Sequence, residues 1–218
     1  MPGRSPLYKE LKRDFDTRKY LITKRLKEFE AVYKQGDQAI FEELCYCIVT
    51  AGSSAKMGMR TIDVLRDILI TGTLEELQNR AQQHRLRFWR IKPAYIVQTR
   101  DFLRQFCNLK LRSLLESFDC KYARRDFFAR NPLIKGLGYK EASHFLRNIG
   151  FQGYAILDKH ILNSLHEMRV ITKTSPPSTR KHYLAIEKKL ELVAQDLGMD
   201  IDHLDLLLWS RKTGEILK

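Results

Sequence analysis

The sequence predicts an all-α protein, and two observations carry that prediction. Apolar residues recur at spacings of three and four over most of the chain, as between Leu11 and Tyr33, and this is the period of an α-helix. Runs in which β-branched residues alternate with polar ones are scarce, so strands have little support. We therefore expect a fold built from helices joined by short loops.

The expected helices follow from this spacing and from the residues that start and stop them. Thr73, followed by Glu76, has the pattern of a capping box at a helix start. Gly150 is well placed to end a helix. Loops are predicted where the spacing breaks, over residues 52–54, 151–153 and 172–179. The predicted helices cover residues 10–36, 39–50, 57–70, 93–106, 110–118, 124–130, 141–148 and 159–168.

The charge balance points to a polyanionic partner. The chain of 218 residues has 39 Lys and Arg against 26 Asp and Glu, a net charge of +13. Nucleic acid is the first candidate for such a surface, and the alternative is a basic surface that serves only solubility. No apolar run approaches the roughly 20 residues that span a bilayer, and the N-terminal residues lack the apolar core of a secretory signal. We expect a soluble globular protein without a membrane partner.

The cysteines favour a reducing compartment over a metal site. Cys45, Cys47, Cys107 and Cys120 form no Cys-x-x-Cys pair. Cys45 and Cys47 lie in an apolar run, where burial as small hydrophobic side chains is expected. We therefore expect no metal and no iron–sulfur cluster. An intracellular location, in the cytoplasm or nucleoid, fits free thiols best.

The segment around Gly136 and Gly138 is the most informative part of the chain. A short helix should stop before Pro132, because the residue before a proline disfavours the helical region. Two glycines one residue apart then allow a tight hairpin with outward-facing N–H groups, and helical spacing resumes at Glu141. Bare N–H groups beside a helix N-terminus form a seat for a phosphate. Gly-x-Gly alone is weak support, since many tight turns contain it.

Lys140 and Asp158 add chemistry to this seat. Lys140 lies in the first turn of the second helix, where the helix dipole favours a neutral and nucleophilic amine. The alternative is an ordinary phosphate-binding lysine. Asp158 follows 18 residues later and precedes a probable helix, so it can cap that helix. One helix of about nine residues and a returning loop could also bring its carboxylate back beside the amine.

These residues carry a resemblance to a known superfamily. The stretch Lys135-Gly-Leu-Gly-Tyr-Lys140, with Leu157-Asp-Lys-His160 at this distance, resembles the helix-hairpin-helix DNA glycosylases. The closer resemblance is to the type 2 8-oxoguanine DNA glycosylases of archaea and some bacteria. It rests on Lys140-Glu-Ala-Ser-His-Phe-Leu-Arg-Asn148, Ala155-Ile-Leu-Asp-Lys-His-Ile161 and Asp205-Leu-Leu-Leu-Trp209 with the terminal Lys218, and it runs from about residue 40 to the end.

The resemblance implies a bifunctional DNA glycosylase/AP lyase with two catalytic residues. Lys140 would attack C1′ of the damaged nucleotide, release the base, form a Schiff base and nick the strand by β-elimination. Asp158 would stabilise the cationic sugar as the glycosidic bond breaks. The 8-oxoguanine must first be flipped out of the duplex, because C1′ is blocked inside the stack.

The resemblance also implies the residues that contact DNA. Gly136, Gly138, Tyr139 and His160 would face phosphates, and the hairpin carbonyls can hold a monovalent cation. No other cofactor is implied, and the chain lacks the four-cysteine motif of the endonuclease III branch. The loop with Ser53, Ser54 and Lys56 would fill the gap that the flipped base leaves. Base recognition would fall to Phe88, His144, Trp209 and Lys218, although aromatic residues at helical spacing are more often core.

The implied architecture has two helical lobes with the active site in the cleft between them. Residues 31–148 would form one lobe that ends in the helix-hairpin-helix, and residues 1–30 with 149–218 would form the other. The implied partner is damaged double-stranded DNA, bound by a monomer. Three alternatives stay open: a glycosylase of this fold for another damaged base, a non-catalytic helix-hairpin-helix module, and a basic RNA-associated protein, which the lack of an RNA-binding loop motif disfavours.

Overall fold

The structure, a computed structural model, describes residues 6–217, and this part of the chain contains helices and no strand. The helices are α1 (Pro6–Lys34), α2 (Asp37–Thr50), α3 (Ala55–Leu65), the 3₁₀ turn η2 (Arg66–Ile68), α4 (Leu74–Gln83), α5 (Ile91–Cys107), α6 (Leu111–Glu116), α7 (Lys121–Arg130), α8 (Tyr139–Asn148), α9 (Lys159–Glu167), α10 (Arg180–Leu197) and α11 (Ile201–Thr213). The all-α prediction is confirmed.

Local signals in the sequence explain where most helices begin. The Thr73 hydroxyl accepts the Glu76 N–H at 3.2 Å, and the Glu76 carboxylate accepts the Thr73 N–H at 2.7 Å, so the predicted capping box forms. The predicted helix over residues 57–70 is shorter in the structure, because α3 ends at Leu65 and the chain tightens into the 3₁₀ turn. The loops at 52–54, 151–153 and 172–179 lie outside the helices, as predicted.

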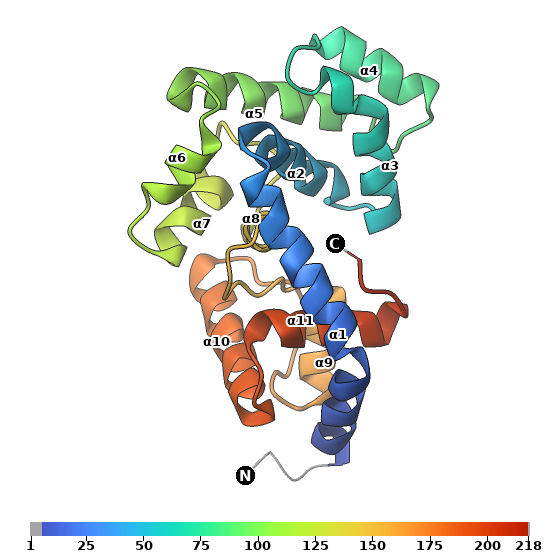
Figure 1. Cartoon of the computed structure of the whole chain (residues 1–218), viewed down its shortest axis with the longest axis vertical. Helices are drawn as coiled ribbons and strands as arrows, with labels where there is room; N and C mark the ends of the chain where they lie inside the picture. Colours follow the sequence, from blue (N-terminus) through green and yellow to red (C-terminus); the bar gives the residue numbers. More distant parts are fainter. Residues whose placement is uncertain (1–5, 218) are drawn as a thin grey trace.

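The helices gather in two groups around separate apolar cores. One core takes its buried side chains from residues 40–154, and the other takes them from α1 and residues 155–208. Figure 1 shows α2 to α7 in the upper half, α9 to α11 in the lower half, and α8 between them. Helix α1 runs through both halves without a break, so it passes the expected boundary at residue 31 as a continuous helix. The division into lobes at these residue numbers stays a prediction.

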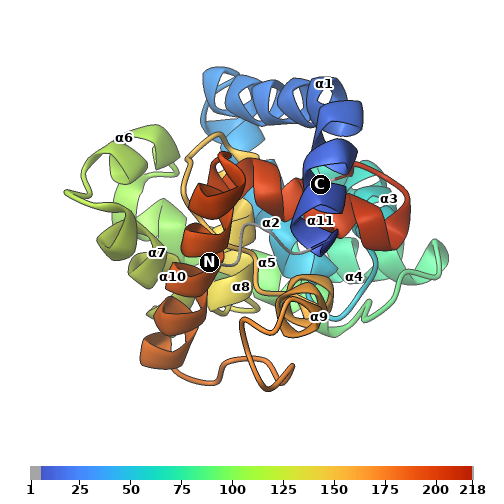
Figure 2. The same ribbon diagram turned by 90° about the horizontal axis from the view of Figure 1, so that it is seen from below.

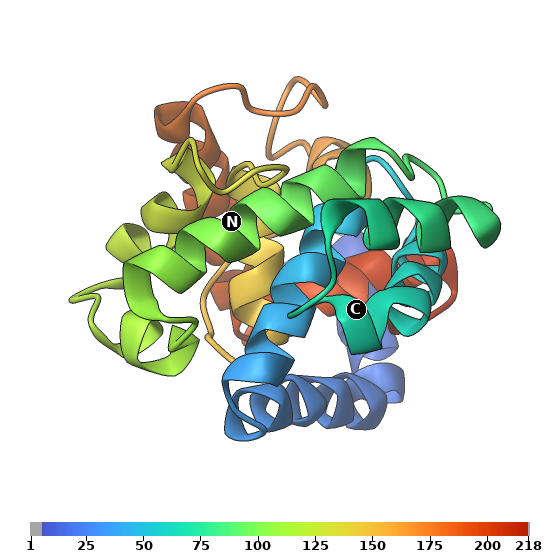
Figure 3. The ribbon, with the colours of Figure 1, turned by 90° about the horizontal axis from the view of Figure 1, so that it is seen from above.

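Different helices pack across the lower and the upper group. Seen from below, α11 lies between α1, α9 and α10, and it packs on all three (Figure 2). Seen from above, α5 crosses the top of the upper group over α2 (Figure 3), and these two helices are in contact.

Cys45 and Cys47 are fully buried in α2, as expected of small hydrophobic side chains. Between residues 6 and 217, no helix is long and apolar enough to cross a membrane.

Candidate active site

The predicted hairpin links α7 to α8. Helix α7 ends at Arg130, and Asn131 is extended, as expected before Pro132. Gly136 has a φ of +80°, and a Cβ at this position would lie 2.9 Å from the ring of Tyr95 on α5. Glycine is therefore required twice over, for its backbone conformation and for its lack of a side chain. Gly138 then opens α8.

The amine of Lys140 is held by its neighbour in the sequence. Lys140 is the second residue of α8, and its Nζ lies 2.9 Å from Oε1 of Glu141. Oε2 of Glu141 accepts the N–H of Gly138 at 3.2 Å, which satisfies one free donor at the helix start. The Lys140 side chain is 34 % exposed, so the amine remains accessible to a ligand. One carboxylate thus engages both the hairpin N–H and the candidate nucleophile.

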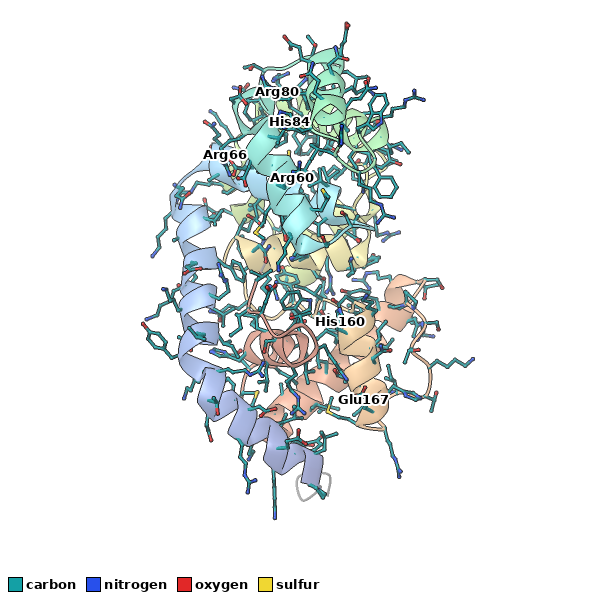
Figure 4. The ribbon with its side chains drawn as sticks, turned by 90° about the vertical axis from the view of Figure 1, so that its right-hand side faces the viewer. Arg60, Arg66, Arg80, His84, His160 and Glu167 are labelled. Atoms are coloured by element: carbon teal, nitrogen blue, oxygen red, sulfur yellow. The ribbon has the colours of Figure 1, made fainter. Side chains whose placement is uncertain are left out.

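Asp158 caps α9 with one of its two carboxylate oxygens. Oδ1 accepts the N–H groups of His160 at 2.8 Å and Ile161 at 2.9 Å. The predicted N-cap role is therefore confirmed. Oδ2 accepts no hydrogen bond within residues 6–217, so the helix cap leaves this oxygen unused. Figure 4 shows His160 at the end of α9 that faces the upper group of helices, with Glu167 at the opposite end.

The segment that leads into Asp158 is neither helix nor strand, and it is held by buried polar side chains of α10 and α11. Each of four successive contacts engages a backbone N–H, so the segment is fixed almost residue by residue. The acceptors are Asp202 for Gly153 at 2.8 Å, Glu187 for Ala155 at 3.1 Å, Asp205 for Ile156 at 3.2 Å and the Tyr183 hydroxyl for Leu157 at 3.4 Å.

The carboxylates of α11 are strongly perturbed by their surroundings. Burial raises the pKa of Asp202 to about 6, and its Oδ1 lacks a hydrogen-bond partner in the described chain. Burial also raises the pKa of Asp205 to about 7, although Arg147, 2.7 Å away, opposes the rise. Asp158 adds to the rise at Asp205 through repulsion, which places the two carboxyl groups in one electrostatic neighbourhood.

A second lysine lies near Lys140. Lys92 on α5 donates to the carbonyl of Ile48 at 2.7 Å, and its Nζ lies 5.9 Å from the ring centre of Phe88 and 5.8 Å from that of Tyr95. Burial lowers the pKa of Lys92, with Glu141 opposing and Lys140 adding to the shift. Phe88 also lies 3.9 Å from the position of a Cβ on Gly52. The structure therefore brings Phe88 beside the predicted gap-filling loop.

The loop residues have partners of their own. Ser54 caps α3 by accepting the N–H of Met57 at 3.2 Å, while Ser53 is half-buried. Lys56 forms an ion pair of 2.7 Å with Glu215 in the C-terminal segment. This contact connects the start of α3 to the chain that follows α11. The predicted role of Lys56, Ser53 and Ser54 in binding DNA stays a prediction.

The remaining candidates occupy three different settings. The hydroxyl of Tyr139 donates to Asp126 at 3.0 Å, and its ring packs against Tyr183, so its contacts are within the protein. His144 is buried, with its ring edge-to-face against Tyr46. Trp209 is half-buried on α11. Lys218 lies outside the described residues.

Comparisons with known proteins identify the family of the chain. The family model described as 8-oxoguanine DNA glycosylase matches residues 22–199, a range that includes Lys140 and Asp158. The 8-oxoguanine DNA glycosylase/AP lyase of Methanocaldococcus jannaschii is 38 % identical over 92 % of this chain and 93 % of its own length. That of Korarchaeum cryptofilum is 37 % identical over 91 % of this chain and 90 % of its own length.

Solved structures agree as well. The crystal structure of the Methanocaldococcus jannaschii 8-oxoguanine DNA glycosylase superimposes with a TM-score of 0.88 at 36 % identity, over 97 % of this chain and 96 % of that one. The chain belongs to the 8-oxoguanine DNA glycosylase family. A second crystal structure of the M. jannaschii enzyme, in complex with a 15mer DNA containing 8-oxoguanine, gives a TM-score of 0.86 at 35 % identity over 96 % of this chain and all of that one.

Several side chains that shape the site of this family member escaped the sequence analysis. Glu141 was expected only as the first residue of a helix, yet it pairs with Lys140. Asp202 and Asp205 could have been noticed, because they are charged residues three apart in an otherwise apolar helical run. Tyr183 and Glu187 carry no such signal, since their spacing of four on a long charged helix is ordinary.

Proposed function

We propose that this protein is a bifunctional DNA glycosylase/AP lyase that excises 8-oxoguanine from duplex DNA. The observation that carries the proposal is the placement of its two candidate catalytic residues in a member of this family. Lys140 lies in the first turn of α8, directly after the Gly136–Gly138 hairpin, and Asp158 lies at the N-terminus of α9 with one carboxylate oxygen unused. The relatives named 8-oxoguanine DNA glycosylase/AP lyase span nearly the whole chain.

The chemistry begins with the amine of Lys140. Its nitrogen attacks C1′ of the flipped nucleotide, and the base departs with the electron pair of the glycosidic bond and takes up a proton. Oδ2 of Asp158 stabilises the positive charge that develops on the sugar. The sugar ring opens to a Schiff base on Nζ. Loss of a proton from C2′ then expels the 3′ phosphate, and the strand is nicked.

DNA is the partner that fits the surface and the hairpin. A net charge of +13 attracts the phosphate backbone, and the start of α8 offers the N–H of Tyr139 to one phosphate, next to the N–H of Gly138 that Glu141 accepts in the structure. In the proposed complex His160 contacts a second phosphate, and residues 53–56 fill the gap in the stack. We propose that a monomer in the cytoplasm or nucleoid acts on damaged double-stranded DNA.

The hairpin also fits a monovalent cation. The carbonyl oxygens of residues 134–137 accept no hydrogen bond from the rest of the described chain, so they are available as ligands. Backbone carbonyls are suitable ligands for such an ion. Residues 134–137 would hold the cation through these carbonyls, and the ion would supply positive charge that attracts a DNA phosphate. We propose no other cofactor and no iron–sulfur cluster.

Base recognition is assigned to residues around the cleft. Phe88 can stack on the flipped base from the side of the loop at Gly52, and Trp209 can stack from α11. His144 lies one turn after Lys140 on the same helix face, which suits a polar contact to the base. The terminal Lys218 completes the proposed set.

The test is cleavage of a panel of duplexes, each with a single modified base, together with borohydride trapping. We expect excision of 8-oxoguanine and a covalent protein–DNA adduct, because the Schiff base is reducible. Lys140→Gln should abolish trapping and leave DNA binding largely intact. Excision of a different modified base alone would assign another substrate, and full trapping by Lys140→Gln would remove Lys140 as the nucleophile. Binding without any cleavage would leave a non-catalytic module.

A further inference from the structure

A buried hydroxyl group joins the two elements that carry Lys140 and Asp158. The Tyr183 hydroxyl, on α10, donates to the carbonyl of Ala155 at 2.7 Å and accepts the N–H of Leu157 at 3.4 Å. Its oxygen lies 3.2 Å from Oγ of Ser143. Because the phenol has one proton and Ala155 takes it, the Ser143 hydroxyl is the donor in this last contact.

Ser143 places the other end of this bridge on the helix of the nucleophile. It lies on α8 three residues after Lys140, which puts the two residues on neighbouring positions of one helix face. Leu157 directly precedes Asp158 in the chain. The path from α8 through Ser143 and Tyr183 to the peptide next to Asp158 therefore consists of two side-chain hydroxyl groups.

An ion pair stiffens the same bridge. Arg125, on α7, binds both carboxylate oxygens of Glu187, at 2.6 and 2.9 Å, and also donates to Ser143 at 3.1 Å. Glu187 in turn accepts the N–H of Ala155. The side chains of Arg125 and Glu187 are 1 % and 3 % exposed, so water does not compete for these bonds. We call Arg125, Ser143, Tyr183 and Glu187 the hydroxyl bridge cluster.

We propose that Tyr183 is a positioning residue for base excision, because its hydroxyl fixes the backbone at Ala155 and Leu157 and thereby sets where Asp158 lies relative to Lys140. The inference rests on the proposed function. Excision requires both groups, since a charge develops on the sugar while the base leaves. A ready-made abasic site has no base to release, and Schiff-base formation there depends chiefly on the amine. Tyr183 therefore matters to the first activity and much less to the second.

The experiment compares two buried tyrosines whose hydroxyl groups form hydrogen bonds to different parts of the backbone. Tyr183→Phe removes the bridge and keeps the ring. Tyr154→Phe is the control: Tyr154 directly precedes Ala155 and is fully buried, but its hydroxyl donates to the carbonyl of Lys121 on α7 at 3.0 Å and not to the backbone of residues 155–158. For both variants, single-turnover excision of 8-oxoguanine and borohydride trapping on an abasic duplex are measured, with DNA affinity and Tm.

We expect Tyr183→Phe to slow excision by on the order of tenfold to 10²-fold, the effect of a small misplacement of a reacting group. Trapping at the abasic site and DNA affinity should stay within about twofold. Tyr154→Phe should lose a similar amount of Tm and keep both rates. Excision by Tyr183→Phe within about twofold of the wild type would overturn the proposal, as would an equal fall of excision and trapping.

Two further arms keep the result unambiguous. If Tyr183→Phe does not fold, Ser143→Ala opens the bridge from the α8 side, and its excision-to-trapping ratio decides the proposal in the same way. The wild-type protein tests the proposed function separately. A wild type that excises no base defeats that function, whereas a wild type that excises 8-oxoguanine while the Tyr183→Phe ratio is unchanged defeats only the positioning role.

Discussion

The two segments that carry the candidate catalytic residues are held in opposite ways. At the start of α8, Lys140 and Gly138 are both bound by Glu141, so these contacts span at most three residues of sequence. In the segment 153–158, the backbone is bound by side chains 26 to 49 residues away. The candidate nucleophile Lys140 is therefore placed mainly by its own helix, whereas the candidate carboxylate Asp158 is placed by the packing of α10 and α11.

Because of this difference, we expect substitutions on one side of the site to lower activity and substitutions on the other side to lower stability as well. A partly exposed amine held by one carboxylate of its own helix can be altered with little effect on folding. Asp158 ends a segment whose backbone is hydrogen-bonded to buried side chains, so its carboxylate cannot be moved without breaking some of those bonds. Buried polar groups that lose their partners lower the free energy of unfolding. Variants on the two sides of the site should therefore differ in whether they lose activity, stability or both.

The largest expected effect comes from Asp158→Asn. Asparagine caps a helix about as well as aspartate, so Tm should change little. The fixed charge opposite the sugar is lost, and excision of 8-oxoguanine should slow by on the order of 10²- to 10³-fold. Single-turnover excision and thermal unfolding of the same preparation measure both quantities. Near-normal excision would mean that Asp158 only caps α9.

Glu187→Gln should lower the free energy of unfolding, because Glu187 holds the segment 153–158 in place. The change leaves the buried guanidinium of Arg125 without its counter-charge, which costs about 3 to 5 kcal/mol of unfolding free energy. Glu191→Gln, one turn further on α10, is the matched control, because that carboxylate is 20 % exposed and pairs with Lys121. The control should lose less than about 1 kcal/mol in denaturant unfolding. Equal losses would mean that the Glu187 contacts are not special.

The pH dependence of stability should reveal Asp202. Its pKa of about 6 in the folded protein exceeds the usual 3.8, so the folded state binds the proton more tightly than the unfolded chain. This contribution is complete below about pH 4 and is lost as pH rises through 6. Relative to Asp202→Asn, the wild type should lose about 3 kcal/mol of unfolding free energy between pH 4 and pH 8. A difference between the two proteins that is constant with pH would contradict the shift.

The smallest effect on stability is expected from Glu141→Gln. Glutamine can still accept the N–H of Gly138, so only the charge beside Lys140 is removed. The unfolding free energy should change by no more than about 0.5 kcal/mol, the range of a surface ion pair. A loss comparable to that of Glu187→Gln would contradict the view that Lys140 is held by local contacts and Asp158 by contacts between distant helices.

The sequence by itself determined the helical class, most helix positions and the hairpin. These depend on contacts within a few residues: the spacing of apolar side chains, the capping pair at Thr73, the glycine that φ demands at position 136, and the cap at Asp158. The pairing of Lys140 with Glu141 is equally local, but a side chain beside a helix start can turn in several directions. The sequence therefore could not specify that contact.

Only the tertiary structure decided what surrounds Asp158. Tyr183, Glu187 and Asp205 reach the segment 155–157 because α10 and α11 pack around it, and the spacing of Tyr183 and Glu187 in the sequence gives no sign of this role. A buried backbone N–H must find an acceptor, yet many polar side chains could serve. Which ones do so is settled by the packing of helices far apart in the chain, and that packing fixes the backbone that leads into Asp158.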